Sequence, residues 1–196
     1  MDHKIPITDI DKIVYSNIII NKNNIKYNIN ELYKNIDLHI LIKNVNIQIL
    51  KFNDDYIITT TNIKMINLRN KFDELIQENN KKYPDIKFNN LDKRASYVKL
   101  NFLDNISKAY INSKKEEKTT ILVKTYEDFV KTYNNYYKVR ETLSADIIIK
   151  PYTTGYNNFV SFSIYDIEIS PKFQCKNIIK KNISYQEQSK EMTIII

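Results

Sequence analysis

Apolar residues along this chain recur at every second position more often than they recur with the period of a helix. The stretch after Phe159 is an example, because Val160, Phe162 and Ile164 alternate with smaller or polar residues. Successive side chains of a strand point to opposite faces of a sheet, so this period indicates strands with one buried face. The sequence therefore predicts a mainly β fold.

Eight segments are predicted as strands, most of them bounded by Asn, Asp or Lys. They are residues 13–20, 38–42, 45–52, 56–61, 96–102, 120–124, 146–152 and 159–169. Two other segments have the period of a helix. Residues 65–80 place Met65, Leu68, Phe72, Leu75 and Ile76 on one stripe. Residues 126–139 begin with a capping pattern, Thr125 with Asp128, and continue with Phe129, Val130, Tyr133 and Tyr137 at helical spacing.

The length of 196 residues suits one domain with a proper core. Two polar connections, residues 79–93 and 112–118, are too short and too poor in Gly, Ser and Pro to be flexible linkers. We therefore predict a single α+β domain over residues 1–196, in which helices near 65–80 and 126–139 are inserted between strands.

Composition excludes several kinds of site. Gly155 is the only glycine, so a glycine-rich loop that cradles phosphate cannot be built. Cys175 is the only cysteine, and with His3 and His39 it gives neither a disulfide framework nor the spacing of zinc ligands. We expect no cofactor and no metal. The chain also has no leader-like start and no apolar run near the ~20 residues that cross a bilayer, which predicts a soluble, intracellular protein.

No catalytic constellation stands out. His39 lies in an apolar stretch without a neighbour that would mark it as a base, which is typical of a structural histidine. Two acidic pairs, Asp54 with Asp55 and Asp166 with Glu168, could bind a metal or share a proton, but paired acids at turns and strand ends are usually solvated. We expect a protein that is not an enzyme, and an enzyme of unfamiliar type stays the third alternative.

Residues 145–170, ADIIIKPYTTGYNNFVSFSIYDIEIS, are predicted to form two strands joined by a turn around Gly155. Pro151 lacks an amide donor and favours a sheet edge or a bulge. Alternation places Ile148, Lys150 and Tyr152 on one face of the first strand.

Aromatic, basic and small polar residues share strand faces at two places. On the second strand of the pair the row is Phe159, Ser161, Ser163 and Tyr165, and in residues 97–102 it is Tyr97, Lys99 and Asn101. Single-stranded nucleic acid needs this mixture, because cations track phosphates and aromatic rings stack on unpaired bases. The net charge of +7 fits such a ligand, but it is weak evidence because abundant Lys, Asn, Ile and Tyr indicate an AT-rich genome.

Residues 145–169 resemble the C-terminal strand pair of viral single-stranded DNA-binding proteins, of the poxvirus type and the related short phage replication proteins. In that family an apolar strand leads into Lys/Thr-Pro-Tyr/Val, a short polar turn with Gly and an alternating strand, as in IIIKPYTTGYNNFVSFSIYDIEI here. The YVKLNF segment, residues 97–102, is similar to a core strand of the family. The resemblance covers about a quarter of the chain.

The resemblance implies a partly open oligonucleotide-binding (OB-fold-like) barrel with inserted helices. It also implies a role in DNA replication, recombination or repair of a virus or similar replicon. The implied location is the host cytoplasm or a viral replication site. Relatives often end in an acidic tail that recruits partners, whereas this chain ends in KEMTIII. The predicted partner is single-stranded DNA, with RNA as an alternative ligand. Further copies of the protein along the DNA strand, and replication proteins, are the other candidate partners.

The predicted function is sequence-independent binding and protection of single-stranded DNA. The candidate phosphate-binding residues are Lys99, Lys150, Arg94, Lys124 and Arg140, and the candidate stacking residues are Tyr97, Tyr152, Tyr156, Phe159 and Tyr165. The alternative is a viral structural or scaffold protein that binds other proteins through its β surface. Salt dependence separates the two, because phosphate contacts weaken steeply with salt and apolar contacts do not.

Overall fold

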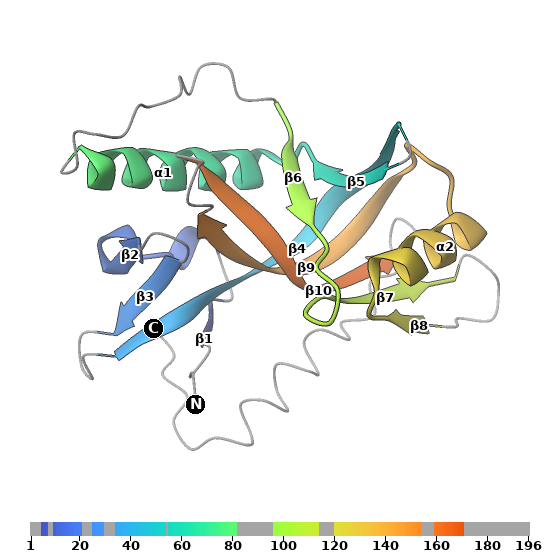
Figure 1. Cartoon of the computed structure of the whole chain (residues 1–196), viewed down its shortest axis with the longest axis horizontal. Coiled ribbons are helices and arrows are strands. Elements are labelled where there is room, and N and C mark those ends of the chain that lie inside the picture. The colour runs from blue at the N-terminus through green and yellow to red at the C-terminus, as the bar shows by residue number, and fades with distance from the viewer. Residues whose placement is uncertain are drawn as a thin grey trace.

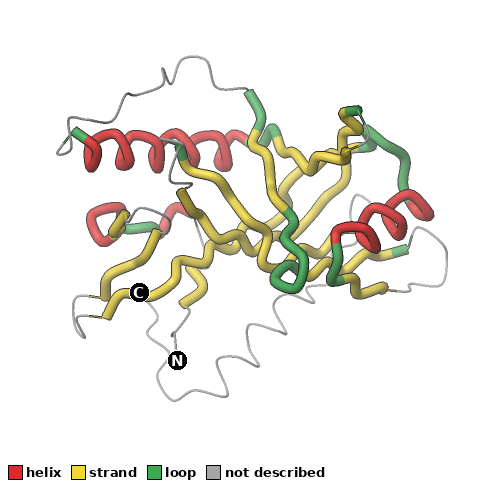
Figure 2. Tube along the Cα trace, in the orientation of Figure 1, coloured by secondary structure: helices red, strands yellow, loops and turns green. Residues whose placement is uncertain are grey.

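The computed structural model describes residues 5–7, 10–20, 25–29, 34–53, 55–81, 96–113, 120–153 and 159–170, which Figure 2 colours by secondary structure. The strands are β1 (Ile5–Ile7), β2 (Ile18–Ile20), β3 (Ile25–Ile29), β4 (Lys34–Phe52), β5 (Asp55–Thr60), β6 (Val98–Asn101), β7 (Lys108–Asn112), β8 (Thr120–Val123), β9 (Thr142–Thr153) and β10 (Val160–Ser170). The α-helices are α1 (Ile63–Asn80) and α2 (Tyr126–Tyr136), and short 3₁₀ turns lie at Ile10–Lys12 and Tyr15–Asn17. The predicted mainly β fold with inserted helices is confirmed.

Five strands pair in a ring, in the order β4, β5, β6, β10, β9 and back to β4 (Figure 1). Every pairing in this ring is antiparallel except that of β6 with β10, which is parallel. The parallel contact is also the shortest, since it joins only Leu100 to Phe162 and Asn101 to Ser163. The ring is therefore least tightly joined between β6 and β10. The remaining strands extend the sheet from β4 and β10.

A bulge bends the long strand β4, which pairs with both β5 and β9 in the ring. Its register with β9 shifts between Ile42 and Val45, where Asn44 has a positive φ of 55°. Asparagine tolerates this left-handed conformation better than most residues. The Asp146 carboxylate on β9 accepts a hydrogen bond of 2.8 Å from the Asn44 amide, which satisfies the group that the bulge removes from the ladder.

The side chains that face into the ring form one continuous hydrophobic core, which includes Ile47, Ile58, Leu100, Ile149 and Phe162. Each is buried, and each lies between outward-facing neighbours along its strand. The period that predicted the strands therefore also predicted which residues fill the core.

The helices lie at opposite ends of this ring (Figure 1). Helix α1 lies where β10 begins: the ring centroids of Phe72 and Phe162 are 6.3 Å apart, edge to face, and the Asp73 carboxylate accepts a hydrogen bond of 2.8 Å from Val160 N. Helix α2 lies where β6 ends, with the ring of Phe129 stacked on Phe102 at 5.2 Å. Both helices were predicted from their apolar spacing.

Several strand predictions need correction. Residues 13–20 were predicted as one strand, but only Ile18–Ile20 forms a strand and Tyr15–Asn17 is a 3₁₀ turn. The separate strands at 38–42 and 45–52 are one strand, β4, because the bulge bends it without breaking it. Three strands, β1, β3 and β7, were not predicted. They are three to five residues long and owe their form to pairing with β4 and β10, which local pattern does not reveal.

Candidate functional site

The outer face of the ring over β6, β10 and β9 gathers the residues that the sequence analysis placed on aromatic and basic rows. Leu100, Phe162 and Ile149 point into the core, so their alternating neighbours point outward. Those outward residues are Lys99 and Asn101 on β6, Ser161 and Ser163 on β10, and Lys150 and Tyr152 on β9. The predicted strand phase thus agrees with which residues enter the core, although Ile148 and Ser163 on the outer face are buried as well.

Tyr152 lies across β10. Its strand neighbour is Ser161, yet its hydroxyl accepts a hydrogen bond of 3.0 Å from Nδ2 of Asn101, which belongs to β6 on the far side of β10. Only a ring that extends over the small side chains Ser161 and Ser163 can make this contact. The long axis of the half-buried ring therefore runs along the sheet. The arrangement is that of a fixed aromatic platform.

Lys99 and Tyr97 lie beside this platform at the start of β6. Lys99 is exposed, and 41 % of Tyr97 is exposed. The Tyr97 carbonyl accepts a hydrogen bond of 2.8 Å from Nη1 of Arg69, a buried residue of α1. The backbone that carries these two side chains is thus held by the helix, while the side chains themselves reach solvent. Asn101, Tyr152, Lys99 and Tyr97 are called the β6 cluster below.

The Lys150 side chain extends toward β4, away from the β6 cluster. Its Nζ lies 2.6 Å from Oδ2 of Asp37 on β4, and the two side chains are 30 % and 15 % exposed. A partly buried pair of this kind neutralises much of the lysine's charge. Lys150 therefore has less free charge to offer a phosphate than the exposed Lys99.

Tyr165 lies farther along the outer face, away from the β6 cluster. It is the extra residue where the β9–β10 register shifts, and its ring centroid is 4.7 Å from that of His39 and 5.9 Å from Lys108 Nζ. The buried carboxyl groups of Asp166 and Glu168 follow on the same strand. Carboxylates repel phosphate, so these surroundings favour nucleic acid less than those of Tyr152.

Asp166 is a buried acid on this part of the outer face. It is 5 % exposed, and its Oδ1 has no hydrogen-bond partner in the part of the chain that the structure describes. Burial raises the pKa of Asp166 to about 6, and the neighbouring Lys108 ammonium opposes the shift. The pairing of β10 with β7 places Asp166 directly beside Lys108.

Two further candidates lie elsewhere. Lys124 is exposed and follows β8, where the register of Ala109 with Val123 places it next to Lys108. Arg140 is exposed in the turn between α2 and β9, has a positive φ of 67°, and donates a backbone hydrogen bond of 2.9 Å to Ile49 O. Neither is part of the β6 cluster.

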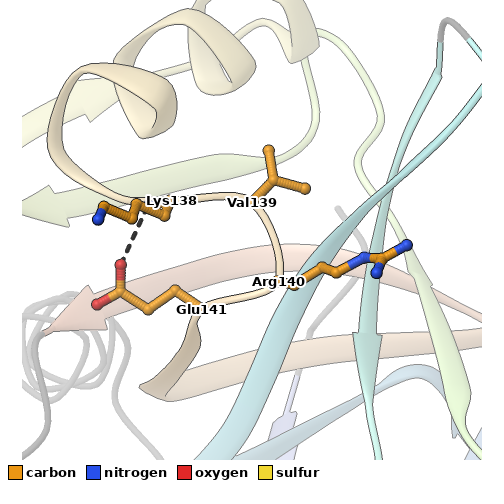
Figure 3. A pocket seen from close by; sticks show the side chains of 4 residues that line it. All are labelled: Lys138, Val139, Arg140 and Glu141. Atoms are coloured by element: carbon orange, nitrogen blue, oxygen red, sulfur yellow. Dashed lines mark hydrogen bonds between the residues drawn. The ribbon is translucent and has the colours of Figure 1, made fainter.

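The turn that holds Arg140 lines a shallow hollow (Figure 3). Its lining residues are Lys138, Val139, Arg140 and Glu141, and the Glu141 carboxylate accepts a hydrogen bond of 3.0 Å from the Lys138 amide. The Arg140 side chain extends away from that bond in Figure 3. The hollow presents no pair of groups poised for catalysis.

Three predicted site residues remain to be located. Arg94 and Tyr156 lie outside the described residues. Phe159 is half-buried and directly precedes β10.

Asn101 was not among the predicted site residues, although alternation placed it on the row of Tyr97 and Lys99. Its contact with Tyr152 depends on the parallel pairing of β6 with β10, which joins segments about sixty residues apart and leaves no local signal.

Within the described ranges, no three His, Cys, Asp or Glu residues are arranged to hold a metal ion, and no helix has the length and apolar character to span a membrane. His39 is buried against Tyr165, an environment that fits the structural reading of this residue. Comparisons of the chain with protein-family models, with curated proteins and with solved structures gave no match. The resemblance of residues 145–169 to viral single-stranded DNA-binding proteins therefore stays a prediction.

Proposed function

We propose that this protein binds single-stranded DNA on the outer face of β6 and its neighbours, without reading sequence. The observation that carries the proposal is the β6 cluster, in which the exposed Lys99 lies between the exposed ring of Tyr97 and the platform of Tyr152. The lysine attracts phosphate, and each ring offers a face on which an unpaired base stacks. Binding and protection of DNA during replication, recombination or repair belong to the same proposal.

The fold supports this choice of face. We propose that the five-stranded ring is an oligonucleotide-binding barrel, joined least tightly between β6 and β10. In such barrels the second and third strands, with the loops after the first and fourth, bind oligonucleotides. In this chain the second and third strands of the ring are β5 and β6, and the loop after the fourth lies between β9 and β10, just beyond Tyr152.

The mechanism has two steps. Electrostatic attraction to the phosphate backbone, centred on Lys99, brings the strand to the sheet. Unpaired bases then stack on Tyr97 and Tyr152, each stack contributing about 1–3 kcal/mol. Neither step involves the edges of the bases, so all sequences bind with similar affinity.

Single-stranded DNA is expected to bind more tightly than duplex DNA of equal length, because only unpaired bases expose the faces that stack. Fluorescence anisotropy with matched single-stranded DNA, single-stranded RNA and duplex DNA measures the three affinities. Repeating the titrations between ~50 and ~200 mM salt gives the number of phosphate contacts from the slope. Tighter duplex binding would exclude stacking, and salt-independent binding would favour the alternative of an apolar protein partner.

Lys99→Gln is expected to reduce the salt slope by about 0.7, the value for one phosphate contact on a single strand. Lys150→Gln is expected to change it less, because the Lys150 ammonium is already paired with Asp37. Both slopes come from the same anisotropy titrations. Lys131, an exposed residue of α2 that is not part of the β6 cluster, provides the matched control Lys131→Gln. Equal slopes for the parent and Lys99→Gln would remove Lys99 from the interface.

A further inference from the structure

We propose that Asn101 is a positioning residue for DNA binding, which acts by holding the Tyr152 ring across β10. This inference rests on the proposed function, since it concerns how the same face is prepared for its ligand. It assigns a role to a residue that makes no ligand contact of its own in the mechanism above. It also predicts that the Tyr152 hydroxyl matters to binding, not only the ring.

The direction of the bond follows from the neighbours of Asn101. Its Nδ2 also lies 3.3 Å from the carbonyl oxygen of Phe162, an atom that can only accept a hydrogen bond. The amide must therefore turn its NH₂ group toward both Phe162 O and the Tyr152 hydroxyl, and the tyrosine oxygen is the acceptor. The backbone of β10 thus fixes Asn101, and Asn101 in turn fixes Tyr152.

The register explains how the bond holds the ring across β10. Asn101 pairs with Ser163, and Tyr152 pairs with Ser161, so β10 separates the two strands that the bond connects. Neighbouring strands lie about 4.8 Å apart, and the two outer strands are therefore roughly 10 Å apart. The tyrosine and asparagine side chains can span this distance only by lying along the sheet. The serines are short enough to leave that space open.

The affinity gained from stacking depends on whether the Tyr152 ring is already held in place before DNA binds. A tyrosine without a partner for its hydroxyl is free to change rotamer, and fixing it upon binding lowers affinity. A ring that already lies on the sheet offers its outer face to a base without this loss. One neutral hydrogen bond contributes about 0.5–1.5 kcal/mol, which corresponds to an affinity change of about 2- to 12-fold.

The test is a double-mutant cycle on the affinity for single-stranded DNA, with the parent, Asn101→Ala, Tyr152→Phe and the double variant. We expect each single change to weaken binding about 3- to 10-fold, and the double variant to be no weaker than either, because both changes remove the same bond. Independent losses that multiply in the double variant, or full affinity in Tyr152→Phe, would overturn the proposal. Thermal unfolding of each variant verifies that the fold is retained.

A second readout reports on the ring itself. A single-stranded oligonucleotide carrying 5-iodouracil forms photo-crosslinks to aromatic rings on which the base stacks, and mass spectrometry locates them. Asn101→Ala is expected to reduce the crosslink at Tyr152 and to leave that at Tyr97 unchanged. Asn46→Ala, at an exposed position of β4, is the matched control. An undiminished crosslink at Tyr152 in Asn101→Ala would refute positioning, whereas absence of DNA binding by the parent would refute the proposed function itself.

Discussion

Replacement of Asp166 by Asn is expected to abolish a loss of stability that the parent protein undergoes between pH 4 and pH 8. Burial raises the pKa of the Asp166 carboxyl in the folded protein to about 6, against an ordinary value of 3.8. A difference of roughly two pKa units corresponds to about 3 kcal/mol. Urea unfolding at a series of pH values measures the free energy of unfolding for both proteins.

The sign follows from proton binding. Between these two pKa values the folded protein keeps the Asp166 proton and the unfolded chain has released it, so a rise in pH favours unfolding. The stabilising contribution is complete below about pH 4 and is lost as the pH rises through about 6. The side-chain amide of the Asp166→Asn variant does not ionise, so its profile lacks this decline and the variant is the more stable protein at pH 8.

Lys108 provides an independent check on the same group. Its ammonium lies beside Asp166 across the β7–β10 pair and opposes the rise in the pKa. Lys108→Gln is therefore expected to move the decline in stability to higher pH and to enlarge it. The exposed Asp55 on β5 gives the control Asp55→Asn, with the parent's decline retained. A decline of the parent's size in Asp166→Asn would contradict the assignment.

The sequence predicted this fold wherever local pattern and tertiary environment agree. Helix α1 is an example, because the stripe of Met65, Leu68, Phe72 and Ile76 is buried as its spacing required. The hairpin of β9 and β10 is another, and Pro151 lies beyond Ile149, the last residue of β9 that pairs with β4. Proline is tolerated there because one side of the strand lacks a ladder partner in that register.

The parts that the sequence could not predict depend on pairing between distant segments. Strand β7 has only five residues, and its place beside β10 is set by a parallel register that no local spacing encodes. The predicted site residues lie in different surroundings for the same reason. Alternation correctly placed Tyr152 and Tyr165 outward, but it could not indicate that Asn101 meets the first and that the second packs against His39 beside the buried Asp166. Nor could it indicate that Asp37 neutralises Lys150.

Tyr152→Leu is expected to weaken the binding of single-stranded DNA by about 1–2 kcal/mol, or roughly 5- to 30-fold. Leucine keeps an apolar side chain beside Ser161, its partner on β10, but has no π face for a base. The loss is therefore smaller than for a typical alanine substitution at a stacking residue. It is larger than the loss in Tyr152→Phe, which keeps the ring and removes only the bond to Asn101.

A matched control separates stacking from stability. Tyr136 on α2 is also half-buried and packs against the core, but it is not part of the β6 cluster. Tyr136→Leu should therefore lower the melting temperature without changing affinity, whereas Tyr152→Leu should lower affinity and change the melting temperature less, because its ring rests on the outer face and not inside the ring of strands. If Tyr152→Leu lowers the melting temperature and leaves affinity intact, Tyr152 serves the fold alone. The DNA-binding face would then have to be sought around Tyr97 and Lys99, on the side of β6 that faces β5.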